Sequence, residues 1–370
     1  MIKAVLASVS LILAAASCVG VAGGNSASDS SGAPEDVQAA ALLDDTMRTY
    51  STAALCAMLA YLDATPTPGE KQALERLRAY GITLATDPAE ALSGHIGLLL
   101  SEARKTPGFK AQVFHDAPAR RYIIAFAGTE PHAPDIITDI DGAFSIDEPQ
   151  NVAALQLTDS IVALLKSVHQ TGNGLLLTGH SLGGRLASVA AITRSADAVV
   201  FNPANIPIDL QRRIEDEKDL RASADTHLLR IHSAADELTG GVRLAEQLSP
   251  YLPYLSAAMD RGLDWLDDRS SLSTLKGIIS TAPEIAGAVG TVWEWLSPAE
   301  AAPAEASVSS LSRIIVEMLA HMRKYGVTVA DLQNPLFYQY RGRAVDLPYL
   351  TGGHSIAPMA VAIDSAYNSK

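Results

Sequence analysis

The segment from Leu175 to Ala191 reads "LLLTGHSLGGRLASVAA" and sets Ser181 among closely spaced glycines. A short apolar run precedes the serine, and small residues with helical spacing follow it. This arrangement fits the G-x-S-x-G pattern, in which a sharp strand-to-helix turn presents a nucleophilic serine above the end of a sheet. Gly179 and Gly183 leave room for the tight turn. The free N–H groups at the start of the helix favour an anion. We therefore predict that Ser181 is a nucleophile.

Strand-like and helix-like patterns alternate around this segment, which predicts an α/β protein with a mostly parallel central sheet flanked by helices. The run 122–127 is apolar throughout and is expected to be a central buried strand, paired in a hairpin with the run before it. Further strands are expected at 175–177, 198–201 and 228–232, and helices at 37–62, 70–80, 88–105, 150–169, 182–195 and 208–215.

The length and the net charge of the chain limit the classes of protein to which it can belong. The chain has 370 residues and is 48% hydrophobic, enough for a sizeable core in one domain, 37–370. The formal net charge of −13 and the absence of basic runs speak against a nucleic-acid partner. The sequence identifies no protein partner.

The first 17 residues have the features of a secretion signal: Lys3, an apolar run and small residues before Cys18. Cys18 follows Ala15-Ala16-Ser17, which resembles a bacterial lipobox with Ala15 in place of the usual leucine. We expect a lipidated Cys18 and a flexible tether to residue 36, and hence a membrane-anchored lipoprotein. Cleavage by the ordinary signal peptidase, which would give a periplasmic or secreted protein, is the alternative. The second cysteine, Cys56, fits a buried core thiol.

A serine nucleophile requires a base and an orienting acid. Asp236 lies just beyond the strand expected at 228–232, where ligand-facing residues of such sheets belong. Glu237 is the nearest competitor, whereas Asp216 and Asp219 lie in a charged helical run. For the base we favour His354 over His321, because His354 lies in a glycine-flanked loop and His321 in a helical pattern.

The chain resembles the class 3, fungal-lipase-like branch of the α/β-hydrolases. Four segments carry the resemblance: "YIIAFAGTE" (122–130), "LLLTGHSLGG" (175–184), "LRIHSAADE" (229–237) and "GGHS" (352–355). It implies that Thr129 and the N–H of Leu182 form the oxyanion hole, and that Asp139 braces the Thr129 hydroxyl. The sequence departs from the family pattern in two places: Ala127 replaces a frequent arginine, and Ile136 replaces a tryptophan at the start of the lid.

Residues 240–339 show helical spacing without a clear strand, and we expect a helical insertion before the catalytic histidine. All three tryptophans, Trp265, Trp293 and Trp295, lie there. Such apolar helices usually pack onto the main domain. The alternative is a cap that shapes an acyl pocket or touches a lipid surface.

The sequence thus predicts a serine hydrolase of lipid acyl esters, acting on a glyceride or on a phospholipid with phospholipase A-type chemistry. It requires no metal and no organic cofactor. Two alternatives stay open: an esterase for short-chain or aryl esters, and a non-catalytic, membrane-tethered binding protein that retains the fold.

Overall fold

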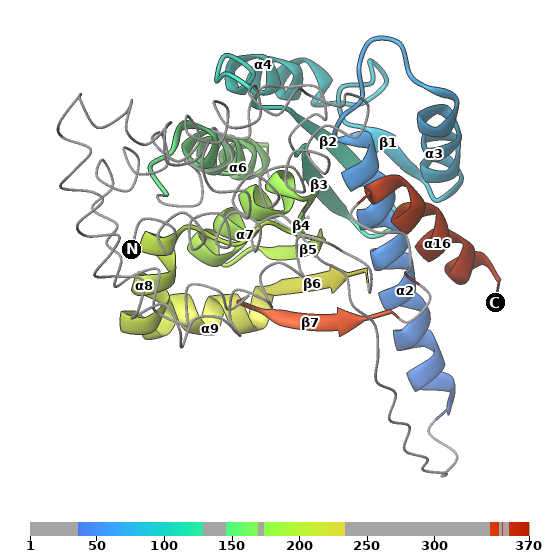
Figure 1. The fold of residues 1–370 in the computed structure, drawn as a ribbon. Coiled ribbons are helices and arrows are strands. Elements are labelled where there is room, and N and C mark those ends of the chain that lie inside the picture. The colour runs from blue at the N-terminus through green and yellow to red at the C-terminus, as the bar shows by residue number, and fades with distance from the viewer. Residues whose placement is uncertain are drawn as a thin grey trace, which may run out of the picture.

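A seven-stranded sheet forms the centre of the computed structural model (Figure 1). The structure describes residues 36–128, 146–168, 174–233, 341–347, 350 and 355–369, with the backbone alone for 36–44 and 346. The predicted signal, the predicted tether except its last residue, Asp36, and the predicted insertion lie outside these residues. So do the predicted residues Cys18, Thr129, Asp139, Asp236 and His354. Within the described part of the chain, no helix has both the length and the apolar character needed to cross a membrane.

The strands lie side by side in the order in which they occur along the chain. The first two pairings are antiparallel, and the remaining four, from β3 to β7, are parallel. The expected mostly parallel sheet is therefore confirmed. The strands are β1 (Ile82–Leu84), β2 (Ala111–Asp116), β3 (Arg121–Phe126), β4 (Gly174–His180), β5 (Asp197–Phe201), β6 (Leu228–His232) and β7 (Arg343–Asp346).

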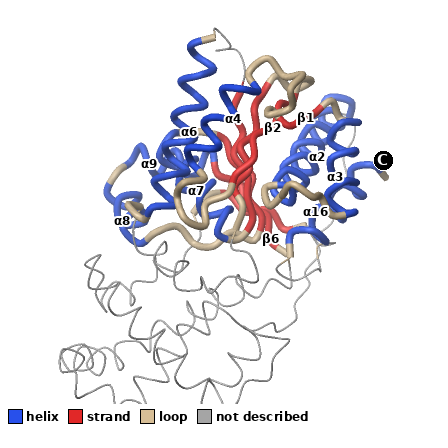
Figure 2. Tube along the Cα trace, turned by 90° about the horizontal axis from the view of Figure 1, so that it is seen from above, coloured by secondary structure: helices blue, strands red, loops and turns tan. Residues whose placement is uncertain are grey.

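Helices cover both faces of the sheet, as Figure 2 shows. A crossover between neighbouring parallel strands is almost always right-handed, so strands added in one direction place their connecting helices on one face. That face carries α4 (Ser93–Ala103), α6 (Pro149–Ser167), α7 (Leu182–Arg194), α8 (Ile208–Asp216) and α9 (Lys218–His227). The opposite face is covered by α2 (Asp36–Leu59), α3 (Pro68–Ala79) and α16 (Ile356–Asn368), which come from the two ends of the described chain.

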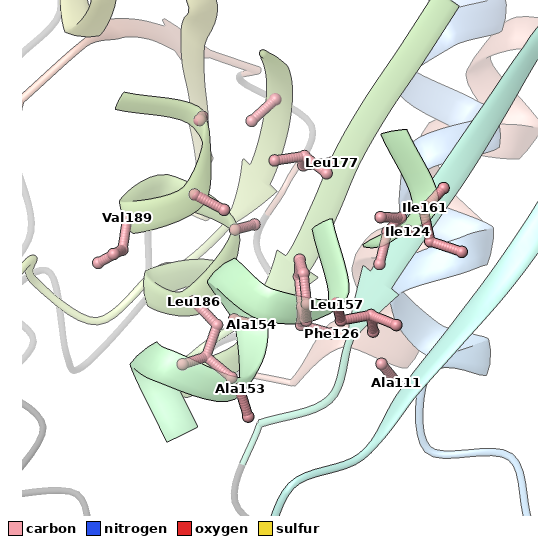
Figure 3. Close-up of a cluster of buried hydrophobic side chains, with 14 of the residues drawn as sticks. Ala111, Ile124, Phe126, Ala153, Ala154, Leu157, Ile161, Leu177, Leu186 and Val189 are labelled. Atoms are coloured by element: carbon pink, nitrogen blue, oxygen red, sulfur yellow. The ribbon is translucent and has the colours of Figure 1, made fainter. Parts of the chain in front are cut away.

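The core is divided by the sheet into two apolar clusters. Side chains of β3 alternate between them, because successive residues of a strand point to opposite faces. Ile124 and Phe126 join the cluster beneath α6 and α7, where Leu157 and Leu186 also lie (Figure 3). Ile123 instead packs toward α2 and α16. The uniformly apolar run that predicted a central strand is therefore a strand buried on both faces.

Most predicted elements are present, with shifted ends. β4 extends to His180, so that the strand continues to the residue before the serine. α4 begins at Ser93 and not at Pro88, since residues 87–93 form successive turns. Three elements were missed: the two edge strands, β1 and β7, and α9, which follows α8 after a single residue, Glu217.

Candidate active site

Ser181 occupies the turn between β4 and α7, as predicted. It is the N-cap of α7 and has a φ of 57° and a ψ of −124°. A positive φ is uncommon for a residue with a Cβ atom and stores backbone strain, which persists only where the surroundings fix it. The backbone of Ser181 is fixed on both sides. Its N–H donates to the Phe201 carbonyl (3.2 Å), and its own carbonyl accepts the Ala204 N–H (2.9 Å).

Two glycines of the motif are required by close backbone contacts. A Cβ atom on Gly179 would lie 2.3 Å from the Gly183 carbonyl oxygen, and one on Gly183 would lie 2.1 Å from the Phe126 carbonyl oxygen. Both distances are far shorter than any van der Waals contact. The pattern in the sequence thus reflects a turn in which the first turn of α7 presses against the ends of β3 and β4.

The N-terminus of α7 provides the electrostatic part of the site. Leu182 is its first helical residue, and the first N–H groups of a helix have no partner within the helix. Their dipoles add to a partial positive charge at this end. The helix itself is rigidly held, because every residue from Leu182 to Ile192 is buried. The role of the Leu182 N–H as an oxyanion donor stays a prediction.

The carboxyl ends of the parallel strands β3 to β7 lie at the same edge as Ser181. In the sheet register Phe126 pairs with Gly179, and His180 pairs with Phe201. Ser233, the first residue after β6, is tied to the same edge through Asn202. Thr129 and Asp236 follow Phe126 and Ser233 by three residues each, although neither lies within the described residues. Their side-chain geometry therefore stays a prediction.

Asn202 joins the chain segments that lead to the predicted acid and base. It is fully buried, and its Oδ1 accepts the Ser233 N–H (2.8 Å). Its Nδ2 donates to Met359 Sδ on α16 (3.1 Å). The Ser233 hydroxyl in turn donates to the Leu350 carbonyl (3.2 Å). Ser233, three residues before Asp236 in the chain, is thereby bonded to Leu350, four residues before His354.

Sequence reasoning missed two polar residues beside the nucleophile, Asn202 and Tyr61. Asn202 follows β5 directly, so the strand-end rule that pointed to Asp236 could have found it. The Tyr61 hydroxyl accepts the Gly128 N–H at 2.8 Å, but no motif surrounds Tyr61 in the sequence. Among the described residues, no group of three or more His, Cys, Asp or Glu side chains could hold a metal ion.

Comparisons with known proteins agree with this geometry. Residues 52–232 match the model of a phospholipase-like family, the Tle-like phospholipase domain. An extracellular phospholipase A1 of Serratia liquefaciens is 31% identical over 99 residues, which are 27% of this chain and 28% of that protein. The match therefore spans less than a third of the relative's length.

Two solved structures are also similar. One is a mutant form of MDLA from Penicillium cyclopium, with 17% identity, 53% of this chain and 72% of that chain covered, and a TM-score of 0.34. The other is the Lip2 lipase of Yarrowia lipolytica, with 16% identity, 52% and 72% covered, and a TM-score of 0.33.

The parallel sheet, the strained serine at the start of a buried helix and the match over residues 52–232 lead to one structural conclusion. The chain is an α/β protein with a mostly parallel sheet, and its residues 52–232 are similar to the Tle-like phospholipase domain.

Proposed function

We propose that this protein is a serine hydrolase that cleaves the acyl esters of lipids. The observation that carries the proposal is the backbone of Ser181, held at positive φ between β4 and the N-terminus of α7. Such strain clusters at functional sites, where the surrounding structure maintains it. A chain that needed only a sheet and a helix here could use a relaxed turn.

Phospholipids are the substrate class that we favour. The matching domain model is that of a phospholipase, and the Serratia relative is described as a phospholipase A1. The proposed reaction is therefore the hydrolysis of a carboxylic ester between a fatty acyl chain and the glycerol of a phospholipid.

The proposed mechanism has two halves. Ser181 Oγ attacks the ester carbonyl carbon while His354 takes its proton, and Asp236 orients the imidazole. The N–H groups of Thr129 and Leu182 stabilise the oxyanion, and Asp139 braces Thr129. The tetrahedral intermediate expels the alcohol, which receives the proton from His354. Water then attacks the acyl-enzyme with His354 as its base. The bond between the acyl carbon and Ser181 Oγ breaks, His354 returns the proton to Oγ, and the fatty acid leaves.

The arrangement of the described segments supports this assignment. The predicted acid follows β6 and the predicted base follows β7, and these strands are parallel neighbours in which Ile231 pairs with Val345. The hydrogen bond from Ser233 to Leu350 joins a residue that follows β6 to a residue that follows β7, at the edge of the sheet where Asn202 lies. The predicted insertion, 240–339, would leave after β6 and return before β7, within the hydrolase domain.

A substrate panel with matched variants tests the function. Purified protein is offered a phospholipid with distinguishable acyl chains, a long-chain triglyceride and a short soluble ester, and the released fatty acid is measured. We expect phospholipid cleavage that falls on the order of a millionfold in Ser181→Ala. His354→Ala should lose most activity and His321→Ala little, and Asp236→Ala should lose more than Glu237→Ala.

Each alternative has its own outcome in the same panel. Turnover restricted to the short ester would favour the small-ester esterase. The absence of Ser181-dependent turnover on every substrate would favour a non-catalytic binding protein and refute the proposal. If His321 proves essential and His354 does not, the assignment of the base is wrong.

We further propose that the protein is exported and anchored to a membrane by lipid on Cys18. The support is the sequence of residues 1–18 and the description of the Serratia relative as extracellular. Mass spectrometry of the mature protein, extracted from membranes, should show a diacylglyceryl group on an N-terminal Cys18. A mature chain that begins after Cys18 would instead indicate soluble export.

A further inference from the structure

Tyr61 connects the ends of the two central strands beside the nucleophile. It lies two residues after the end of α2, and its hydroxyl oxygen accepts the Gly128 N–H, two residues after β3, at 2.8 Å. The same oxygen lies 3.4 Å from Nδ1 of His180, the last residue of β4. One hydroxyl group from the N-terminal part of the chain therefore contacts the backbone that precedes Thr129 and the residue that precedes Ser181.

The direction of the first of these hydrogen bonds follows from its donor. A backbone N–H can only donate, so the Tyr61 oxygen is the acceptor of the bond from Gly128. The direction of the contact with His180 Nδ1 depends on the ring tautomer: Nδ1 accepts from the hydroxyl when the neutral ring carries its proton on Nε2, and donates to it when the proton is on Nδ1. In either tautomer the Tyr61 hydroxyl joins Gly128 to His180.

The backbone of Gly128 lies in close contact with the turn that carries Ser181. A Cβ atom on Gly128 would lie 2.6 Å from the Tyr61 oxygen, 2.7 Å from the His180 carbonyl oxygen and 3.3 Å from Ser181 Cβ. The Gly128 backbone therefore runs in direct contact with the serine turn. Any shift of this backbone changes its distance from the carbon that Ser181 attacks.

The hydrogen bond from Gly128 to Tyr61 also limits which backbone N–H groups can bind the oxyanion. The Gly128 N–H points at the Tyr61 oxygen and is not available to an oxyanion. The next N–H along the chain is that of Thr129, the predicted oxyanion donor. Because Gly128 is bonded to Tyr61, the peptide unit that follows it starts from a fixed position.

We propose that Tyr61 is a positioning residue for the oxyanion hole, which it holds in place through Gly128 while it bonds to His180 beside the nucleophile. The inference rests on the proposed function. Donors of an oxyanion hole act because they are aligned before the charge develops. A misplacement of about 1 Å at such a site lowers the rate about a hundredfold. Tyr61 itself does not touch the substrate in this scheme.

The test compares Tyr61→Phe with Tyr50→Phe. Both remove one hydroxyl from a tyrosine that packs against the cluster beneath α2, but Tyr50 lies within α2, 11 positions before Tyr61 in the chain. Each variant hydrolyses a short soluble ester and the matching thionoester, in which sulfur replaces the carbonyl oxygen. Sulfur is larger and a weaker hydrogen-bond acceptor, so an aligned oxyanion hole strongly prefers the oxygen ester. The ratio of the two rates reports on the hole and not on overall folding.

We expect Tyr61→Phe to lower kcat for the oxygen ester about 10- to 100-fold with little change in KM. The rate ratio of oxygen ester to thionoester should fall by a similar factor. Tyr50→Phe should keep both values. If Tyr61→Phe does not fold, as judged by its thermal transition, Tyr61→His replaces it, and a ratio below that of the wild type is again expected.

An unchanged rate ratio in the folded Tyr61 variant overturns the proposal, whatever happens to total activity, because a purely structural role would lower the active fraction and leave the ratio intact. Ser181→Ala separates this failure from a failure of the proposed function. Wild-type turnover that depends on Ser181, together with an unchanged ratio, refutes only the role of Tyr61. Turnover that does not depend on Ser181 refutes both.

Discussion

Arg48 on α2 bonds in a bidentate manner to Asp116, the last residue of β2. Arg48 Nη1 lies 3.1 Å from Asp116 Oδ2, and Arg48 Nη2 lies 2.9 Å from Oδ1. Arg121 adds a third bond, from Nε to Asp116 Oδ2 at 3.0 Å. The Asp116 side chain has no exposed surface. One buried carboxylate of β2 therefore binds a guanidinium group of α2 and a guanidinium group of β3, and so attaches α2 to this hairpin.

This cluster makes the protein sensitive to acid. Burial alone would raise the pKa of Asp116, but the hydrogen bond from Arg48 and the charges of Arg121 and Arg48 outweigh it, so the pKa is lowered. A lowered pKa contributes stability that is present above the unfolded value, about 3.9, and lost as the pH falls through the folded value. We expect Asp116→Asn to reduce the free energy of unfolding by about 3 kcal/mol at pH 7, because it leaves two partly buried arginines without their buried carboxylate.

Urea unfolding at a series of pH values checks this expectation. The gap between the wild type and Asp116→Asn should shrink as the pH drops below about 4. Asp159, which pairs with Arg194 at 2.7 Å, is a suitable control because its side chain is 51% exposed. Asp159→Asn should cost less than about 1 kcal/mol. Equal losses for the two variants would show that burial of the carboxylate is not the cause.

The backbone strain at Ser181 should lower the free energy of unfolding by a measurable amount. Glycine adopts a φ of 57° without the clash of a Cβ atom, whereas alanine keeps that clash. Both Ser181→Gly and Ser181→Ala should lack hydrolysis. We expect Ser181→Gly to be more stable than Ser181→Ala by about 1 kcal/mol, since relief of strain exceeds the greater entropy of glycine in the unfolded chain. Urea unfolding compares the two proteins directly, and a more stable alanine variant would contradict the strain.

A pair of glycine substitutions tests the contact between α7 and β3. Gly183→Ala should reduce the free energy of unfolding by about 3 kcal/mol, because its new methyl group would meet the Phe126 carbonyl. Gly97 lies inside α4, and a Cβ atom there would have no neighbour within 4 Å. Gly97→Ala should therefore stabilise the protein by up to about 1 kcal/mol. Thermal unfolding shows whether each substitution raises or lowers the stability of the protein. A destabilising Gly97→Ala would contradict the described packing of α4.

Cys56 should be inert in the native protein. It is fully buried in α2, and burial raises the pKa of its thiol well above the usual range. The thiolate is the reactive form, so modification requires unfolding. In a Cys18→Ser variant, Cys56 is the single cysteine. A thiol reagent should then react at the rate of unfolding, accelerated by urea, and rapid reaction in native buffer would show that α2 opens by itself.

The parts of the fold that could be predicted are those with local causes. The strand at 122–127 has an apolar side chain on both faces, and the turn at Ser181 needs glycines at fixed spacing, so both are visible in a few residues. β1 and β7 have only three and four residues, and each has a single neighbour, since they form the edges of the sheet. Their short, mixed sequences provide too little periodicity for a prediction.

The residues of the candidate site also divide into those that a local sequence pattern reveals and those that it does not. Ser181 could be found because its motif is continuous in the chain. Tyr61 and Gly128 are 67 positions apart, and Asn202 and Met359 are 157 apart, so their contacts arise only when the sheet is assembled. Thr129, Asp139, Asp236 and His354 lie outside the described residues and stay predictions.

The two helical layers differ in when they can form during synthesis. All the connecting helices on one face are encoded between neighbouring strands and can dock as each strand is added. The other face needs α2, which is made early, and α16, whose Asp364 accepts bonds from Ser51 of α2 at 2.8 Å and from Arg76 of α3 at 2.9 Å. Until the ribosome has released residues 356–368, one side of the sheet lacks part of its cover. This delay suits the export that we propose, because a nascent protein that cannot finish folding stays competent to cross the membrane.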